Sequence, residues 1–137
     1  MQAAEAAIVI FLFINSINDI KRREIILWSA VFMGVFGFIV SVLLFKRNIC
    51  EIAFGIVPGV LLLICAIISD GKLGLGDVII MIVVGIWQGL IRTVYIVFAA
   101  LFGAALYGTF LIIINKKYRD IPFIPFICMG QLITWLV

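Results

Sequence analysis

Histidine is absent from this sequence of 137 residues, and charged residues make up only 12% of it. Without an imidazole, the chain can form neither a Ser-His nor a Cys-His catalytic pair and offers no histidine ligand to a metal. Its three cysteines (Cys50, Cys65 and Cys128) are widely separated and include no Cys-x-x-Cys pair. We therefore expect no metal and no cofactor, and any chemistry has to come from the few acidic and basic side chains.

Apolar residues fill most of the chain, at 66% of the sequence with a mean hydropathy of +1.38. Soluble domains are about half apolar and about a quarter charged. The composition therefore predicts an all-α integral membrane protein with the lipid bilayer as its surroundings. The net charge of +3 is small, and we interpret it as a signal of membrane topology rather than of nucleic-acid binding.

Short polar stretches divide the chain into apolar segments. At roughly 20 residues per spanning helix, six short-looped spans nearly exhaust its length, so we predict one transmembrane domain over residues 1–137, a bundle of about six helices. The first segment lacks the positive start of a signal peptide, which indicates a retained span. The expected spans are 2–18, 25–45, 52–68, 78–90, 93–114 and 121–137.

The fourth segment, 78–90, has only 13 residues and is too short to cross a membrane unaided. Either it starts below the membrane surface, which would place Asp77 within the membrane, or Gly89 and Arg92 extend it while the Arg92 side chain reaches back to water. The sequence leaves both alternatives open.

The basic residues predict the orientation of the chain. With six spans, the first, third and fifth loops share one side and carry seven basic residues, whereas the second and fourth carry three. The positive-inside rule places the richer side in the cytoplasm and both termini outside. Asp19 and Asp77 then lie on the same, cytoplasmic side of the membrane. The seven basic residues are Lys21, Arg22, Arg23, Lys72, Lys116, Lys117 and Arg119.

Residues 69–77 form the longest polar and glycine-rich interruption of the apolar chain. Its glycines allow positive φ angles and a close approach of another chain. Asp77 then opens an apolar run, and Asp19 similarly follows the first apolar segment. An acid at the mouth of a membrane segment is costly and calls for a reason. Glu5, by contrast, is expected to have ordinary interfacial surroundings at a segment end.

Two facing carboxyl groups can share one proton and activate water, which is the pattern of aspartic proteases and needs no metal. Purely structural roles for the two acids are the alternative to this interpretation. Asp77 could cap the helix that follows it, and Asp19 could be held at the membrane surface by Lys21 and Arg22. On residue chemistry alone, capping and anchoring are favoured roughly two to one.

Three motifs then identify a resemblance. Gly74-Leu75-Gly76-Asp77 matches the Gly-x-Gly-Asp signature of intramembrane aspartic proteases. Residues 19–26 resemble the pattern Asp-x-(Arg/Lys)-x-x-x-Ile-Pro, and residues 122–126, with Gly130 beyond, resemble a Pro-Phe-x-Pro stretch. In this order, across nearly the whole chain, they are similar to small prepilin peptidases, also called type IV leader peptidases. The resemblance reverses the preference in favour of catalysis.

The resemblance implies an aspartic endopeptidase that clips the short basic leader of type IV prepilin-like or pseudopilin precursors at the cytoplasmic face of the cell membrane. It implies catalytic roles for Asp19 and Asp77 and substrate-binding roles for Gly74, Gly76 and Lys72. Larger members of the family carry a methylating domain with paired cysteines. This chain has no room for one, so it should cleave without methylating. The class of pilin substrate and the oligomeric state stay open.

Two positions depart from the family pattern. Ile26 stands in place of the usual proline, and Ile79 in place of a lysine two residues after the second acid. The Ile79 departure keeps open a catalytically inactive member of the family used as a scaffold. A separate alternative, from a different functional class, is a non-enzymatic channel or transporter subunit with an ion-coupling carboxylate.

Overall fold

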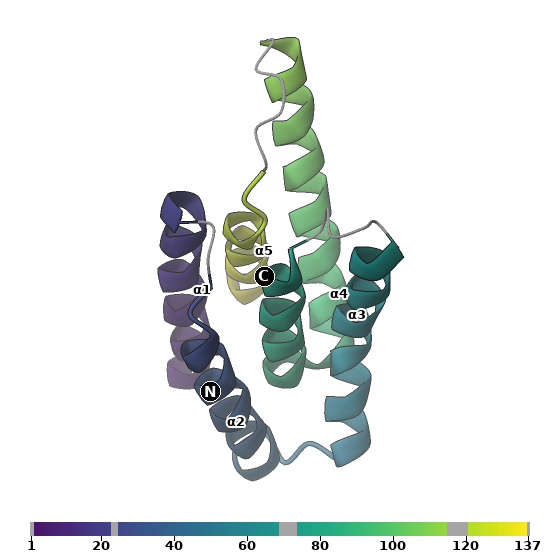
Figure 1. Cartoon of the computed structure of the whole chain (residues 1–137). Coiled ribbons are helices and arrows are strands. Elements are labelled where there is room, and N and C mark those ends of the chain that lie inside the picture. The colour runs from purple at the N-terminus through teal and green to yellow at the C-terminus, as the bar shows by residue number, and fades with distance from the viewer. Residues whose placement is uncertain (1, 23–24, 69–73, 115–120, 137) are drawn as a thin grey trace.

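The computed structural model describes residues 2–22, 25–68, 74–114 and 121–136, and these residues are almost entirely helical (Figure 1). The helices lie side by side in one bundle. Their bounds are α1 (Gln2–Arg22), α2 (Leu27–Leu43), α3 (Ile49–Ile68), α4 (Leu75–Ile113) and α5 (Ile124–Leu136).

The expectation of an all-helical protein is confirmed, but the expectation of six separate helices is not. Five helices are defined in the described residues, because α4 runs over both the fourth and the fifth expected spans. Helix α4 is nevertheless not a straight rod. Gly89 has φ 74° and ψ 176°, which is not a helical conformation and is one that glycine alone adopts readily.

Side chains from α2 and from the loop after it bind the carbonyl groups just before this break. The Ser41 hydroxyl donates a hydrogen bond to the Ile86 carbonyl at 2.8 Å, and Arg47 Nη1 donates one to the Trp87 carbonyl at 2.6 Å. The last carbonyls of a helix need partners from outside it. The first half of α4, residues 75–88, thus ends as a separate helix does.

Contacts of α1 give the directions of the neighbouring helices. Near its start, Glu5 accepts hydrogen bonds from Gln88, at the end of the first half of α4, and from Gln131, in the second half of α5. Near its end, Asp19 accepts one from the backbone N–H of Ile124, where α5 begins. Helix α1 therefore runs antiparallel to α5 and to the first half of α4.

The second half of α4, residues 90–113, is also antiparallel to α5. A side chain on Gly130 would meet the Ile96 carbonyl, and one on Gly103 would meet the Phe126 ring. The two halves of α4 consequently run in opposite directions, and Figure 1 shows the chain doubling back between them. The expected boundary between two spans thus exists, but as a one-residue reversal rather than a loop.

Helix α3 lies against the first half of α4 with little between the two backbones. A Cβ on Gly55 would collide with the carbonyl oxygen of Gly85, and a Cβ on Gly85 would collide with that of Gly55. Small residues at a helix crossing allow this approach, as is common between membrane helices.

The outer surface of the bundle is apolar. Large exposed apolar side chains occur on all five helices, including Phe13, Phe32, Leu61, Phe98 and Leu136. In the described residues, α3 and α4 are long and apolar enough to cross a membrane, and α2 and α5 are shorter apolar helices. So large an apolar surface is suited to lipid rather than to water. The structure is that of a helical membrane protein.

Candidate active site

Asp19 lies in the last turn of α1, half-buried, and faces the start of α5. Its Oδ2 accepts the backbone N–H of Ile124 at 3.3 Å. The first N–H groups of a helix have no partner within the helix and carry partial positive charge, so they favour a carboxylate. Helix α5 thereby holds the Asp19 carboxyl group at this end of the bundle, which we call the aspartate end.

Asp77 lies in the first turn of α4, also half-buried. Its backbone N–H bonds to the Gly74 carbonyl at 3.1 Å, which starts the helix. Its carboxyl group folds back over Gly74, where an added Cβ would lie 3.2 Å from Asp77 Oδ2. No side-chain capping bond is made by Gly74, the N-cap residue of α4. The Asp77 carboxyl group is therefore packed closely against Gly74, where a larger residue would crowd it.

The structure places the two acids at the same end of the bundle although they come from different parts of the chain. Asp19 is among the charges that act on the Asp77 carboxyl group. Two acids that sense each other are disfavoured as a pair of anions and can share one proton. Such a pair can supply an acid and a base at once, without a metal or a histidine.

The two acidic motifs also touch through their apolar residues. A Cβ on Gly76 would lie 3.1 Å from Ile25 Cγ2. Ile25, from the first motif, therefore packs directly on the second glycine of the Gly-x-Gly-Asp motif. The next residue is fixed by α1, because the backbone N–H of Ile26 donates to Asn15 Oδ1 at 3.4 Å. Asn15 is fully buried and donates in turn to the Phe11 carbonyl.

Asn15 is a site residue that the sequence reasoning missed. It lies one helical turn before Asp19 on α1 and binds the segment that carries Ile25 and Ile26 against the glycine motif. The available signal was the position of Asn15 inside an apolar segment, because polar residues in membrane helices usually have a partner within the protein.

The third motif lies at the same end of the bundle. Phe123 and Ile124 are buried, and the Phe123 carbonyl accepts the first backbone bonds of α5. Pro125 follows at a position where the missing N–H of proline does no harm. All three sequence motifs therefore meet at the aspartate end.

Two residues singled out in the sequence, Lys72 and Ile79, do not add to the site in the described structure. Lys72, expected to bind substrate, lies outside the described residues. Ile79, at the position of a lysine in the family pattern, is partly buried and packs against the apolar core. Across the described segments, His, Cys, Asp and Glu side chains form no group of three that could hold a metal ion.

Glu5 corrects a further expectation. Instead of ordinary interfacial surroundings, its side chain is only 11% exposed and forms an ion pair with Arg92 at 2.7 Å. The amide nitrogens of Gln88 and Gln131 donate to the same carboxylate at 2.7 and 3.3 Å. Burial without partners would be very costly for this acid, and these groups supply them. Glu5 joins α1, α4 and α5 at what we call the arginine end, opposite the aspartate end.

Comparison with families of known proteins places the geometry in context. The model of the type IV leader peptidase family matches residues 6–113, which cover both acidic motifs. Comparisons with curated proteins and with solved structures gave no match. The matched range covers more than half of the chain and extends from α1 through α4. The chain therefore belongs to the type IV leader peptidase family.

Proposed function

We propose that this protein is a membrane-embedded aspartic endopeptidase whose catalytic pair is Asp19 and Asp77. The observation that carries the proposal is the convergence of the two acids at one end of the bundle, within the range matched by a peptidase family. The half-buried position of both carboxyl groups supports it further, because a dyad needs low polarity around it and access for water.

In the proposed reaction the ionised carboxylate of the pair takes a proton from water as the oxygen attacks the scissile carbonyl. The protonated carboxyl group donates a hydrogen bond to that carbonyl oxygen. In the second step the proton roles reverse, the amide nitrogen is protonated, and the C–N bond breaks. The pair titrates as a unit, so the two roles belong to the dyad rather than to one named residue.

The substrate class follows from the family: a prepilin-like precursor, cut between its short basic leader and its hydrophobic helix. Gly74 and Gly76 are proposed to contact the segment around the cut because they are small residues next to Asp77, with the Asp77 carboxyl group packed on Gly74 and Ile25 packed on Gly76. Lys72 is proposed to contact the same segment. The apolar outer face of the bundle offers the hydrophobic part of the substrate a lipid environment next to the site.

The proposed topology counts each half of α4 as a span, giving six. The reversal at Gly89 supports this count. By sequence the odd-numbered loops are the basic ones, and the first of them follows α1 at the aspartate end, so this end would face the cytoplasm and both termini would lie outside. The first half of α4 is short for a full span, which would leave the dyad slightly below the membrane surface. Non-helical backbone is tolerated at such a depth where it lines a cavity that water can enter.

The test is cleavage of a tagged prepilin co-expressed with the full chain, read as a gel shift and as the mass of the new N-terminus. Asp19→Asn and Asp77→Asn keep the shape of each side chain and remove its charge. Cys50→Ser, an equally small change on an exposed residue far from the aspartate end, is the matched control. We expect wild type and Cys50→Ser to cut, and both Asn variants to lose cleavage by at least about a thousandfold while membrane levels stay equal.

Each other outcome has a distinct meaning. If the Asn variants cut as wild type does, the acids are structural and the proposal fails. A transporter would instead depend on one of the two acids and respond to an ion gradient. If only one Asn variant differs from wild type and the protein responds to such a gradient, the transporter interpretation is favoured. If wild type leaves a panel of pilin classes uncut, the scaffold interpretation replaces the peptidase.

A further inference from the structure

The arginine end holds two guanidinium groups close together. Arg47 follows α2, is half-buried, and has its guanidinium 5.0 Å from the centre of the Phe45 ring. Burial lowers the pKa of Arg47 from its ordinary value, and the nearby positive charge of Arg92 lowers it further. The carboxylates of Glu5 and Glu51 act in the opposite direction and raise this pKa, so cations and acids are both present at this end. A pair of neighbouring cations favours an anionic group beside them.

Arg47 and Arg92 both line one cavity of about 380 Å³, which we call the arginine cavity. Arg47 bonds to the Trp87 carbonyl, and Arg92 bonds to Glu5 and Gln88. A guanidinium has five N–H donors, so these bonds occupy only part of each donor set. Arginine is well suited to bind phosphate through paired N–H groups. The remaining lining residues are Glu51, Phe54, Gln88, Gly89, Leu90 and Ile91.

The position of the cavity fits a membrane surface. It lies between the polar loop that precedes α3 and the reversal in α4, where apolar helices give way to charged residues. Its lining changes from Arg47 and Glu51 to Phe54, Leu90 and Ile91. A ligand that matches both parts has a charged group and an apolar body.

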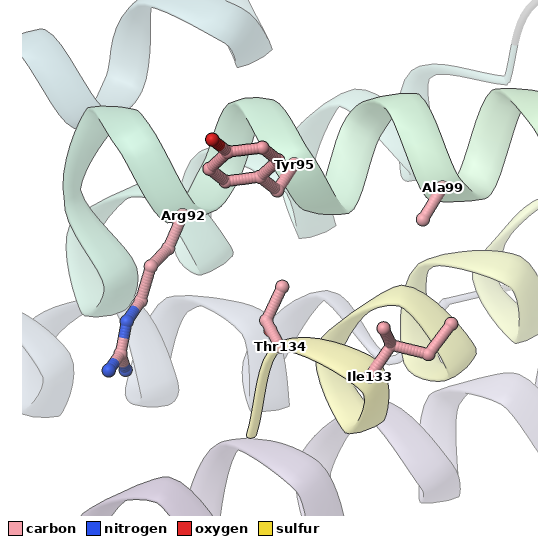
Figure 2. A pocket seen from close by; sticks show the side chains of 5 residues that line it. All are labelled: Arg92, Tyr95, Ala99, Ile133 and Thr134. Atoms are coloured by element: carbon pink, nitrogen blue, oxygen red, sulfur yellow. The ribbon is translucent and has the colours of Figure 1, made fainter. Parts of the chain in front are cut away.

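Arg92 also lines a second cavity of about 350 Å³, between the second half of α4 and α5. Figure 2 shows Arg92 near one end of this cleft and Ala99 and Ile133 at the other, with Tyr95 and Thr134 between them. The cleft is lined mostly by apolar atoms. Arg92 is therefore the point at which a charged cavity and an apolar cleft meet, which is the division found in a phospholipid.

We propose that the arginine cavity binds the headgroup of phosphatidylethanolamine, with its phosphate on Arg47 and Arg92 and its ammonium on Glu51. The exposed Glu51 carboxylate would repel a purely anionic headgroup but attract the ammonium of this one. Glu5 is already paired with Arg92 inside the bundle. The headgroup therefore matches the charges of the cavity in sign and number, and the apolar cleft beside Arg92 accommodates one acyl chain.

The test uses the full chain, delipidated in detergent, with native mass spectrometry to count bound lipids. The probes are phosphatidylethanolamine, phosphatidylglycerol, soluble glycerophosphoethanolamine and inorganic phosphate. Arg47→Gln removes one phosphate ligand, and Lys46→Gln is the matched control because Lys46 is the adjacent, exposed cation outside the cavity. Glu51→Gln removes only the partner of the ammonium.

We expect one phosphatidylethanolamine molecule per chain, bound more tightly than phosphatidylglycerol. Loss of a charge-assisted hydrogen bond should weaken binding by about tenfold or more in Arg47→Gln, and Lys46→Gln should bind as wild type does. Glu51→Gln should abolish the preference between the two lipids. If Arg47→Gln does not fold, the exposed Glu51→Gln variant decides the matter alone.

Three results would overturn the proposal. Equal binding of both lipids by wild type would refute the headgroup assignment. Equal losses in Arg47→Gln and Lys46→Gln would show attraction to general surface charge. Competition by inorganic phosphate or by the soluble headgroup at the concentration at which the lipid binds would show that the acyl chains contribute nothing, and that the ligand is a free phosphate compound.

Discussion

Replacing Arg92 with glutamine should destabilise the fold more than replacing Glu5 with glutamine, although each change removes the same ion pair. The side chain of Glu5 is 11% exposed and that of Arg92 48% exposed. In Arg92→Gln a buried carboxylate keeps its charge and loses its counter-charge. In Glu5→Gln the stranded cation can turn toward water, and the new amide oxygen still accepts hydrogen bonds.

The burial of the two groups sets the magnitudes. Breaking a fully buried pair costs about 3–5 kcal/mol. Because Arg92 is half-exposed and two amides still bind Glu5, we expect about 1.5–3 kcal/mol for Arg92→Gln. For Glu5→Gln we expect about 1 kcal/mol. The double variant should cost about as much as Glu5→Gln, because it leaves no buried charge unpaired.

Thermal unfolding in lipid-free detergent, followed by circular dichroism, measures all four members of this cycle. A loss of 1 kcal/mol corresponds to roughly 3–5 °C for a chain of this size, so Arg92→Gln should unfold roughly 5 °C or more below wild type. Additive effects in the double variant, or a larger cost for Glu5→Gln, would refute the reasoning. Either result would mean that Glu5 is not a buried anion held by Arg92.

Three further changes probe the bundle. The two glycine changes use the same measurement, with Gly34→Ala as control because a Cβ there makes only an ordinary contact, and the third uses the cleavage assay. Gly85→Ala should cost about 1–3 kcal/mol through collision with α3, and a wild-type melting temperature would contradict the close crossing. Gly89→Ala should cost a similar amount because φ is 74°, unless the chain reversal is absent. Asn15→Ala leaves the Ile26 N–H without its partner, so cleavage should fall by about tenfold or more with normal membrane levels, and unchanged cleavage would remove Asn15 from the site.

The helical membrane character could be predicted from composition, because apolar content on this scale has few other outcomes. The six-segment pattern came close to the observed chain path. It placed a boundary between Leu90 and Thr93, and the chain reverses at Gly89. Hydropathy could not give the form of this boundary, since a one-residue reversal leaves the apolar run uninterrupted. Its signal was conformational: a glycine in a position that other residues avoid.

The candidate site was predicted from motif order rather than from physical spacing. Nothing in the sequence alone brings Asp19 toward Asp77, and their approach in the structure depends on helix packing. Catalysis by the pair stays a prediction. Glu5 was misjudged because its partners, Gln88, Arg92 and Gln131, lie on distant helices. Burial of this kind is a tertiary property, and a charge near a segment end gives no local sign of it.

Helix α5 has a consequence for the order of assembly in the membrane. It lies beyond the range matched by the family model, yet it supplies the N–H bound by Asp19 and the amide bound by Glu5. A nascent chain delivers its helices in sequence, beginning at the N-terminus. Asp19 and Glu5 both lie on α1 and would enter the bilayer long before α5. Helix α1 would therefore lack its contacts with α5 during that time. The arrangement proposed for catalysis would then be completed only when α5 arrives, and until then Asp19 and Glu5 would lack the partners that α5 supplies.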